Sequence, residues 1–334
     1  MIGAAKYEIR KGFEGMKEKK RIKEEFMTKT IVVWLGAMLC CALWGSAFPC
    51  IKIGYMLFSI PAEDTAAQIL FAGYRFTLAG ILTIMIGSVL NRGFLLPKKE
   101  SVRKIVWLSM LQTVAQYMFF YVGLAHTTGV KASIIEAVNV FIAILVASLV
   151  FRQERLTAKK MLGCVVGFLG VVLVNMTKSG LDTSLSFTGE GFILLSTVAY
   201  AFSSVYLKRY SQKEDPVILS GYQFVTGGII MSLCGILMGG KVTGFYAASS
   251  AMLIYLALVS AVAYSLWGIL LKYNPISKVA VFGFMTPVFG VILSALFLPG
   301  EDQALEIKSI AALVLVCAGI YTVNHVRPEN TGKK

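Results

Sequence analysis

Long apolar stretches alternate with short polar ones along most of the chain. A helix that spans a bilayer needs about 20 mostly apolar residues. Ten stretches meet this requirement, and we expect each to form a helix, with boundaries good to about 3 residues. They lie near residues 31–54, 66–90, 105–125, 130–151, 160–177, 190–207, 216–238, 249–271, 278–298 and 307–325. The pattern predicts an all-α integral membrane protein with ten transmembrane helices and leaves no room for a soluble catalytic domain.

The composition supports this fold class. Of 334 residues, 57% are hydrophobic and 15% are charged, whereas soluble domains average about 45–50% and about 25%. These values exclude an ordinary soluble enzyme and a disordered protein. The net charge of +14 would suit either a nucleic-acid partner or a membrane, so the position of the charges matters.

The basic residues gather on one side of the predicted membrane. If the ten spans alternate in direction, 26 Lys and Arg lie with the two termini and only four lie opposite. Basic loops mark the cytoplasmic side of membrane proteins. We therefore expect a basic cytoplasmic N-terminal tail (1–30) and a cytoplasmic C-terminal tail (326–334). Nucleic-acid binding is disfavoured because the basic loops are short and lack stacking aromatics.

The two halves of the chain resemble each other. Tyr74-Arg75-Phe76 matches Tyr222-Gln223-Phe224, and Glu154 closes span four as Glu301 closes span nine. Each repeat holds five spans, an odd number, so the second copy must enter the membrane from the opposite side. The sequence thus predicts a 5+5 inverted-topology repeat over residues 31–177 and 190–325. Many secondary transporters build alternating access from such repeats.

Several motifs resemble the EamA family of the drug/metabolite transporter superfamily. Trp44-Gly45-Ser46-Ala47-Phe48 followed by Lys52 is similar to its first-helix signature, Arg75-Phe76 to its second-helix arginine, Phe151–Leu156 to its Glu-Arg-Leu element and Pro287-Val288 to its ninth-helix proline. The resemblance covers about residues 31–325. It departs from the family pattern at Asn139, at Gly300–Asp302 and at Glu136. It implies a ten-helix bundle around a central cavity, in a bacterial inner membrane, which exports small metabolites, amino acids or drugs.

Three ionisable residues lie within the predicted spans. Because such groups are costly in a membrane, Arg75, Glu136 and Lys52 are functional candidates. In one hypothesis Arg75 binds a substrate carboxylate, while Glu136 meets an ammonium group or carries a proton. In the other, Arg75 and Glu136 form a structural ion pair. Lys52 is a gating candidate or simply extends to the lipid headgroups.

Aromatic and small residues supply further candidates. Six aromatic residues fall near the expected midplane, where they line a cavity or pack between helices. They are Trp44, Tyr74, Tyr200, Tyr222, Tyr264 and Trp267. Ser46 and Pro49 interrupt span one and could expose carbonyl groups to the cavity. Three glycines in span five have the spacing of close helix–helix contacts, either within one chain or in a homodimer. They are Gly163, Gly167 and Gly170.

The function expected from these observations is secondary transport of a small-molecule substrate, most simply export. Uptake on the same architecture is an alternative. A membrane-embedded lipid-modifying enzyme is a weaker one, because it needs an acidic metal-binding cluster such as DxxxD, which the sequence lacks. The six cysteines fall in apolar runs without metal-ligand spacing. We therefore predict no catalytic residues, no metal and no cofactor.

Overall fold

A computed structural model describes residues 18, 21–22, 24–127, 129–176, 186–297 and 307–325, without the side chains of 129–131, 133, 174 and 307–309. The predicted N-terminal tail lies largely outside these residues. The predicted C-terminal tail and Glu301 lie wholly outside them.

Every regular element in the described part of the chain is helical. Three elements are π-helical (η1, η2, η3) and one is a 3₁₀ helix (η4). In chain order the elements are α2 (Thr30–Leu57), α3 (Thr65–Leu90), α4 (Lys99–Leu108), η1 (Ser109–Ala115), α5 (Gln116–Leu124), α6 (Gly129–Ala137), α7 (Asn139–Leu145), η2 (Val146–Val150), α8 (Ala158–Asn175), η3 (Phe187–Gly191), α9 (Phe192–Ser211), α10 (Pro216–Leu237), α11 (Ala247–Tyr273), α12 (Ile276–Ala280), η4 (Val281–Phe284), α13 (Met285–Phe297) and α14 (Ile307–Asn324).

Seven helical stretches within the described residues are long and apolar enough to cross a membrane. They are Thr30–Leu57, Thr65–Leu90, Lys99–Leu124, Phe187–Ser211, Pro216–Leu237, Ala247–Tyr273 and Ile276–Phe297. Two further apolar helices, Ile134–Val150 and Ile310–Asn324, are shorter. The prediction of an all-α, multi-pass membrane protein is confirmed, and the helices coincide with the predicted apolar segments.

Polar residues at the segment ends determine where several helices begin. The Asp64 carboxylate accepts a hydrogen bond from the Ala67 N–H (2.8 Å) before α3, and Asp215 accepts one from the Val217 N–H (2.7 Å) before α10. Both satisfy a backbone donor that a helix start leaves free. Pro216 at the first position of α10 needs no such partner. Pro49, which the sequence predicts to interrupt the first span, lies inside α2, and this helix continues from Thr30 to Leu57 without a break.

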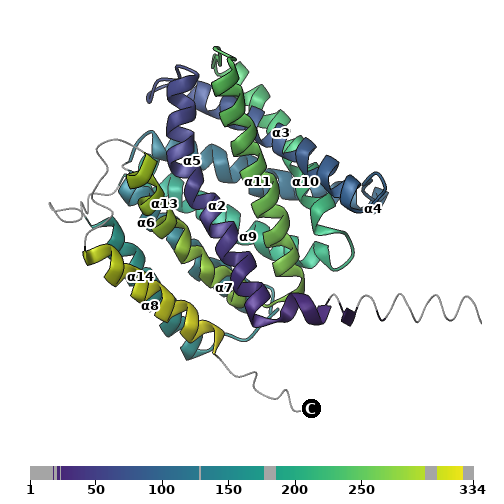
Figure 1. Cartoon of the computed structure of the whole chain (residues 1–334), viewed down its shortest axis with the longest axis vertical. Helices are drawn as coiled ribbons and strands as arrows, with labels where there is room; N and C mark the ends of the chain where they lie inside the picture. Colours follow the sequence, from purple (N-terminus) through teal and green to yellow (C-terminus); the bar gives the residue numbers. More distant parts are fainter. Residues whose placement is uncertain are drawn as a thin grey trace, which may run out of the picture.

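Close helix pairs link the first half of the chain to the second. α3 packs along α10 and α8 along α14, while α2 contacts α11 and α13, and α9 contacts α5 and α7. Figure 1 shows α8 and α14 side by side at one edge of the bundle. Glycines bring these backbones together: a Cβ added to Gly228 would lie 2.4 Å from the Thr77 backbone nitrogen.

Three of the predicted spans are irregular within the membrane region. A π-helical turn (η1) separates α4 from α5, the fourth span is interrupted at Val138 between α6 and α7, and 3₁₀ helix η4 separates α12 from α13. π-Helical turns inside longer helices often mark functional sites. The apolar pattern of the sequence did not predict any of these interruptions.

Hydrogen bonds draw several loops together at one end of the bundle. We call this the basic end and define it by loops 91–98, 151–157, 212–215 and 274–275. Lys208 Nζ donates to the carbonyl oxygens of Leu271 (2.8 Å) and Asn274, and Asn274 Nδ2 donates to the Met27 carbonyl (3.0 Å). Glu154 accepts from the Ser277 N–H and from Lys160 Nζ, both at 2.9 Å. These bonds join the end of α9 to the end of α11, loop 274–275 to the segment before α2, and the start of α12 to loop 151–157.

Candidate functional site

Arg75 lies near the middle of α3 and is 3% exposed. Its guanidinium faces α11, where Nε and Nη2 donate to Ser260 Oγ (3.1 and 2.9 Å) and Nε also donates to the Leu256 carbonyl (3.3 Å). All these acceptors are neutral. The ion pairs within the described residues do not include Arg75. Arg75 therefore places an uncompensated positive charge in the protein core.

Aromatic side chains surround this charge. The hydroxyls of Tyr117 and Tyr264 are hydrogen-bonded to each other (2.7 Å), and the Arg75 charge acts on both. The charge also reaches the buried hydroxyls of Tyr55 and Tyr121. The cluster thus offers a cation, phenol groups and aromatic faces, a combination that suits a small organic anion.

Trp44 extends this cluster along α2. Its ring lies edge-on to the rings of Tyr264 (5.1 Å) and Trp267 (5.0 Å). The Trp44 indole N–H is buried and has no acceptor. Because a buried indole normally finds a hydrogen-bond partner, Trp44 has a donor available for a ligand. The structure brings four of the predicted residues into or next to one cluster: Arg75, Trp44, Tyr264 and Trp267.

Glu136 does not join that cluster. It lies at the end of α6, two residues before the interruption at Val138, and is partly buried. It makes no hydrogen bond or ion pair with any residue that the structure describes. The hypothesis of a structural ion pair between Arg75 and Glu136 therefore has no support in this conformation.

Other predicted residues occupy separate positions. Ser46 Oγ bonds to the Leu43 carbonyl (2.7 Å) and to the Tyr255 hydroxyl (2.8 Å). The Tyr222 hydroxyl donates to the Leu95 carbonyl (2.9 Å), near the basic end. The Tyr200 carbonyl accepts from the hydroxyls of Ser203 and Ser204. Lys52 is exposed.

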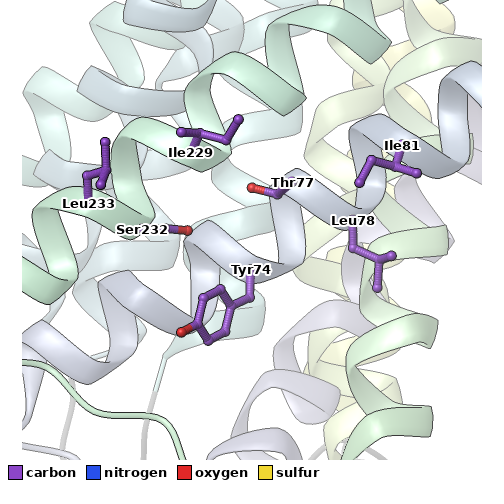
Figure 2. A pocket seen from close by; sticks show the side chains of 7 residues that line it. All are labelled: Tyr74, Thr77, Leu78, Ile81, Ile229, Ser232 and Leu233. Carbon is purple, nitrogen blue, oxygen red and sulfur yellow. The ribbon is translucent and has the colours of Figure 1, made fainter.

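Tyr74 lines an open groove between α3 and α10, shown in Figure 2. The groove has a volume of about 350 Å³ and is almost entirely apolar. Its lining consists of Tyr74, Thr77, Leu78, Ile81, Ile229, Ser232 and Leu233. Its lining suits apolar chains and presents few polar groups to a ligand.

The predicted packing glycines lie along α8. Gly163 and Gly170 face α14, where an added Cβ would come within 3.0 Å of the backbone nitrogens of Val323 and Val316. Gly167 faces the ring of Phe284 in η4. The contact between α8 and α14 lies within one chain.

Four residues of the Arg75 cluster escaped sequence reasoning: Ser260, Tyr55, Tyr117 and Tyr121. None carries a charge, so none stands out in an apolar span. The internal repeat holds a usable signal, because Ser260 follows Gln112 by 148 positions, the same interval that separates Gln223 from Arg75.

The comparisons with known proteins agree with this architecture. The model of the EamA-like transporter family matches residues 31–176 and again 187–325. An uncharacterized transporter from Archaeoglobus fulgidus is 26% identical over 301 residues, which cover 87% of this chain and 98% of the relative. The uncharacterized transporter YvbV of Bacillus subtilis and the uncharacterized inner membrane transporter YedA of Escherichia coli are each 24% identical, covering 84% of this chain and 88% of the relative.

A solved crystal structure has the same fold. It superposes with a TM-score of 0.69 at 17% identity and covers 87% of this chain and 95% of its own. The family model matches almost the whole helical region, in two consecutive copies. The chain is thus a multi-pass membrane protein, and it belongs to the EamA-like transporter family.

Proposed function

We propose that this protein is a secondary transporter with ten membrane-spanning helices in a 5+5 inverted repeat. It exports small metabolites, amino acids or drug-like compounds by alternating access across a bacterial cytoplasmic membrane, with both termini in the cytoplasm. The relatives are named transporters, one of them in the inner membrane. The distribution of Lys and Arg supports the orientation.

The helix contacts support the inverted repeat. α2 opens the first half and contacts α11 and α13, which belong to the third and fourth spans of the second half. α9 opens the second half and contacts α5 and α7, from the third and fourth spans of the first. α3 with α10 and α8 with α14 join equivalent spans. A pseudo-two-fold axis produces this reciprocal pattern, and such repeats place the substrate between them.

The substrate site is centred on Arg75. The observation that carries this proposal is its burial against neutral acceptors alone, because intramembrane charges ordinarily pair with an opposite charge. A substrate carboxylate supplies the missing negative charge. Glu136 is the proposed proton-coupling residue, since its carboxylate has no partner among the described residues.

Transport by the purified protein in proteoliposomes tests this site. Wild type is expected to move amino acids but not the corresponding decarboxylated amines. Arg75→Gln, which installs the residue of the matching position 223, should lower amino-acid transport by about tenfold or more because a charged hydrogen bond is lost. Arg103→Gln removes an exposed arginine and should leave transport unchanged. Full activity in Arg75→Gln would refute the site.

The same vesicles test Glu136. If it carries the coupled proton, Glu136→Gln removes the pH dependence of transport while substrate binding persists. A wild-type rate with an unchanged pH profile would exclude that role. Direction is tested in intact cells with toxic amino-acid analogues: overexpression should give resistance if the protein exports, and sensitivity if it takes substrate up.

A further inference from the structure

A stripe of polar residues runs along η1 and the start of α5, inside the bundle. Its members are spaced by three, one, three and one positions, so they share one helix face. They are Ser109, Gln112, Thr113, Gln116 and Tyr117. The first four are at most 8% exposed, although the helix around them is apolar. A polar face turned inward, on a π-helical turn, suits a passage or binding site better than lipid contact.

Several amide groups in this region lack hydrogen-bond partners. Both polar atoms of the Gln112 side chain are buried and unpartnered, as is Gln116 Oε1. On the facing helix α10, Gln223 Oε1 accepts from the Thr113 hydroxyl (2.8 Å), but Gln223 Nε2 has no acceptor. Buried amides are normally satisfied because an unmade bond is costly. Three glutamines therefore keep donors and acceptors available for a bound molecule.

The arrangement repeats that of the Arg75 cluster. Gln223 follows Arg75 by 148 positions, and Ser260 follows Gln112 by the same interval. Arg75 bonds to Ser260, and Gln223 bonds to Thr113, the neighbour of Gln112. The Tyr117–Tyr264 hydrogen bond links the two regions. One half of the repeat thus presents a cation at this position and the other a neutral amide.

We propose that Gln112, Gln116 and Gln223 form a second binding site, nearer the basic end, which takes an uncharged hydrogen-bonding group of the substrate such as a carboxamide. This inference rests on the proposed transport function. The structure describes three buried charged side chains: Arg75 is bonded to Ser260, Glu190 to Thr127 and Ser186, and Glu214 to Ser101. None of them is bonded to a glutamine of the cluster. A carboxamide pairs with glutamine as both donor and acceptor.

The stability of the purified full-length protein in nanodiscs gives the first test. Gln112→Leu should raise the melting temperature by a few degrees, because it replaces an unpartnered buried amide with an apolar group of similar size. Gln68→Leu is the matched control. Gln68 is also buried, but its Nε2 donates to the carbonyls of Pro61 (3.3 Å) and Ala62 (2.8 Å), so this change should lower the melting temperature. A lowered melting temperature in Gln112→Leu would overturn the proposal.

The second test compares asparagine with leucine, two amino acids of equal side-chain shape that differ in the amide. Both carry the carboxylate proposed to bind Arg75. Asparagine should raise the melting temperature of wild type at about tenfold lower concentration than leucine does. The Gln112→Leu protein should still be stabilised by both amino acids, but at equal concentrations.

Each result has a defined meaning. Equal responses to the two amino acids, both lost in Arg75→Gln, would mean that the glutamine cluster holds only water, and would overturn this inference while the Arg75 site stands. A wild-type protein that responds to neither amino acid would remove the Arg75 carboxylate site and the second site with it.

Discussion

Glu214 is a buried carboxylate at the basic end, outside the membrane-spanning segments. Its Oε2 accepts from Ser101 Oγ (2.7 Å) and the Lys98 N–H (3.4 Å), and its Oε1 accepts from the Asp215 N–H (3.1 Å). Burial alone would raise its pKa, but these hydrogen bonds and the Lys98 charge outweigh burial and hold the pKa below the ordinary value of 4.5. The ionised form therefore stabilises the fold.

We expect this stabilisation to depend on pH. A lowered pKa contributes stability that is present above pH 4.5 and is lost as pH falls through the lower native value. Glu214→Gln should therefore melt at a lower temperature than wild type at pH 7, and the difference should shrink below pH 4.5. Ser101→Ala removes one of these hydrogen bonds, so its melting temperature should lie between those of wild type and Glu214→Gln. Melting curves recorded from pH 7 to pH 4 measure this. A difference that is constant with pH would contradict this account.

The sequence identifies individual residues unevenly. Arg75 is found because a charge in an apolar span is conspicuous, whereas its partner Ser260 and the three glutamines are uncharged and pass as ordinary helix residues. The spacing of Ser109, Gln112, Thr113, Gln116 and Tyr117 is visible in the sequence. Only the fold shows that this face is turned inward and that its amides lack partners.

At the scale of the helix, close pairs depend on the absence of side chains. A Cβ on Gly319 in α14 would lie 2.5 Å from the Gly163 carbonyl oxygen and 2.6 Å from the Gly167 nitrogen in α8. These are backbone atoms that cannot move aside without separating the helices. The contact therefore tolerates only glycine at this position.

Gly319→Ala is expected to destabilise the protein by about 1–3 kcal/mol, the usual range for overpacking. Gly93→Ala is the control, since its Cβ would meet only the Asn91 carbonyl oxygen, at 4.0 Å. Heating both variants in detergent and measuring the remaining monodisperse protein gives the comparison. An unchanged melting temperature for Gly319→Ala would mean that α8 and α14 do not pack this closely.

Helix positions are predictable from the sequence because hydropathy alone determines which segments enter a membrane. Interruptions are not, because η1, the break at Val138 and η4 depend on how neighbouring helices take up freed backbone groups. Glu136 illustrates the difference: its place in span four is readable from the sequence, but its position beside an interruption and away from Arg75 is not.

For the whole molecule, the hydrogen bonds of the basic end link helices from both halves. Asn274 donates to the Met27 carbonyl and the Ser277 N–H donates to Glu154, so these bonds cross between the halves. Lys208 holds Asn274 in place by donating to its carbonyl oxygen and to that of Leu271. Under the proposed alternating access, these contacts hold the basic end closed and must break when it opens.

Lys208→Met should therefore make the interior more accessible from this end. A cysteine at position 220, in place of the buried Ser220, should react faster with a water-soluble thiol reagent when Lys208→Met is also present. Lys213→Met removes an exposed charge nearby and should not change the rate. Equal rates in all three proteins would indicate that Lys208 does not help to close this end.

The isolated charge of Arg75 also has an electrical consequence. A full elementary charge that crosses a membrane exchanges about 2.3 kcal/mol with each 100 mV of potential. Under the proposed alternating access, Arg75 carries such a charge through part of that field when the empty protein changes conformation. A bound carboxylate without an ammonium group cancels this charge, whereas a zwitterionic amino acid adds no net charge and leaves it in place. Membrane voltage would then act on the empty step alone for the first kind of substrate and on both steps for the second, so one arginine makes the voltage dependence of transport depend on the charge of the substrate.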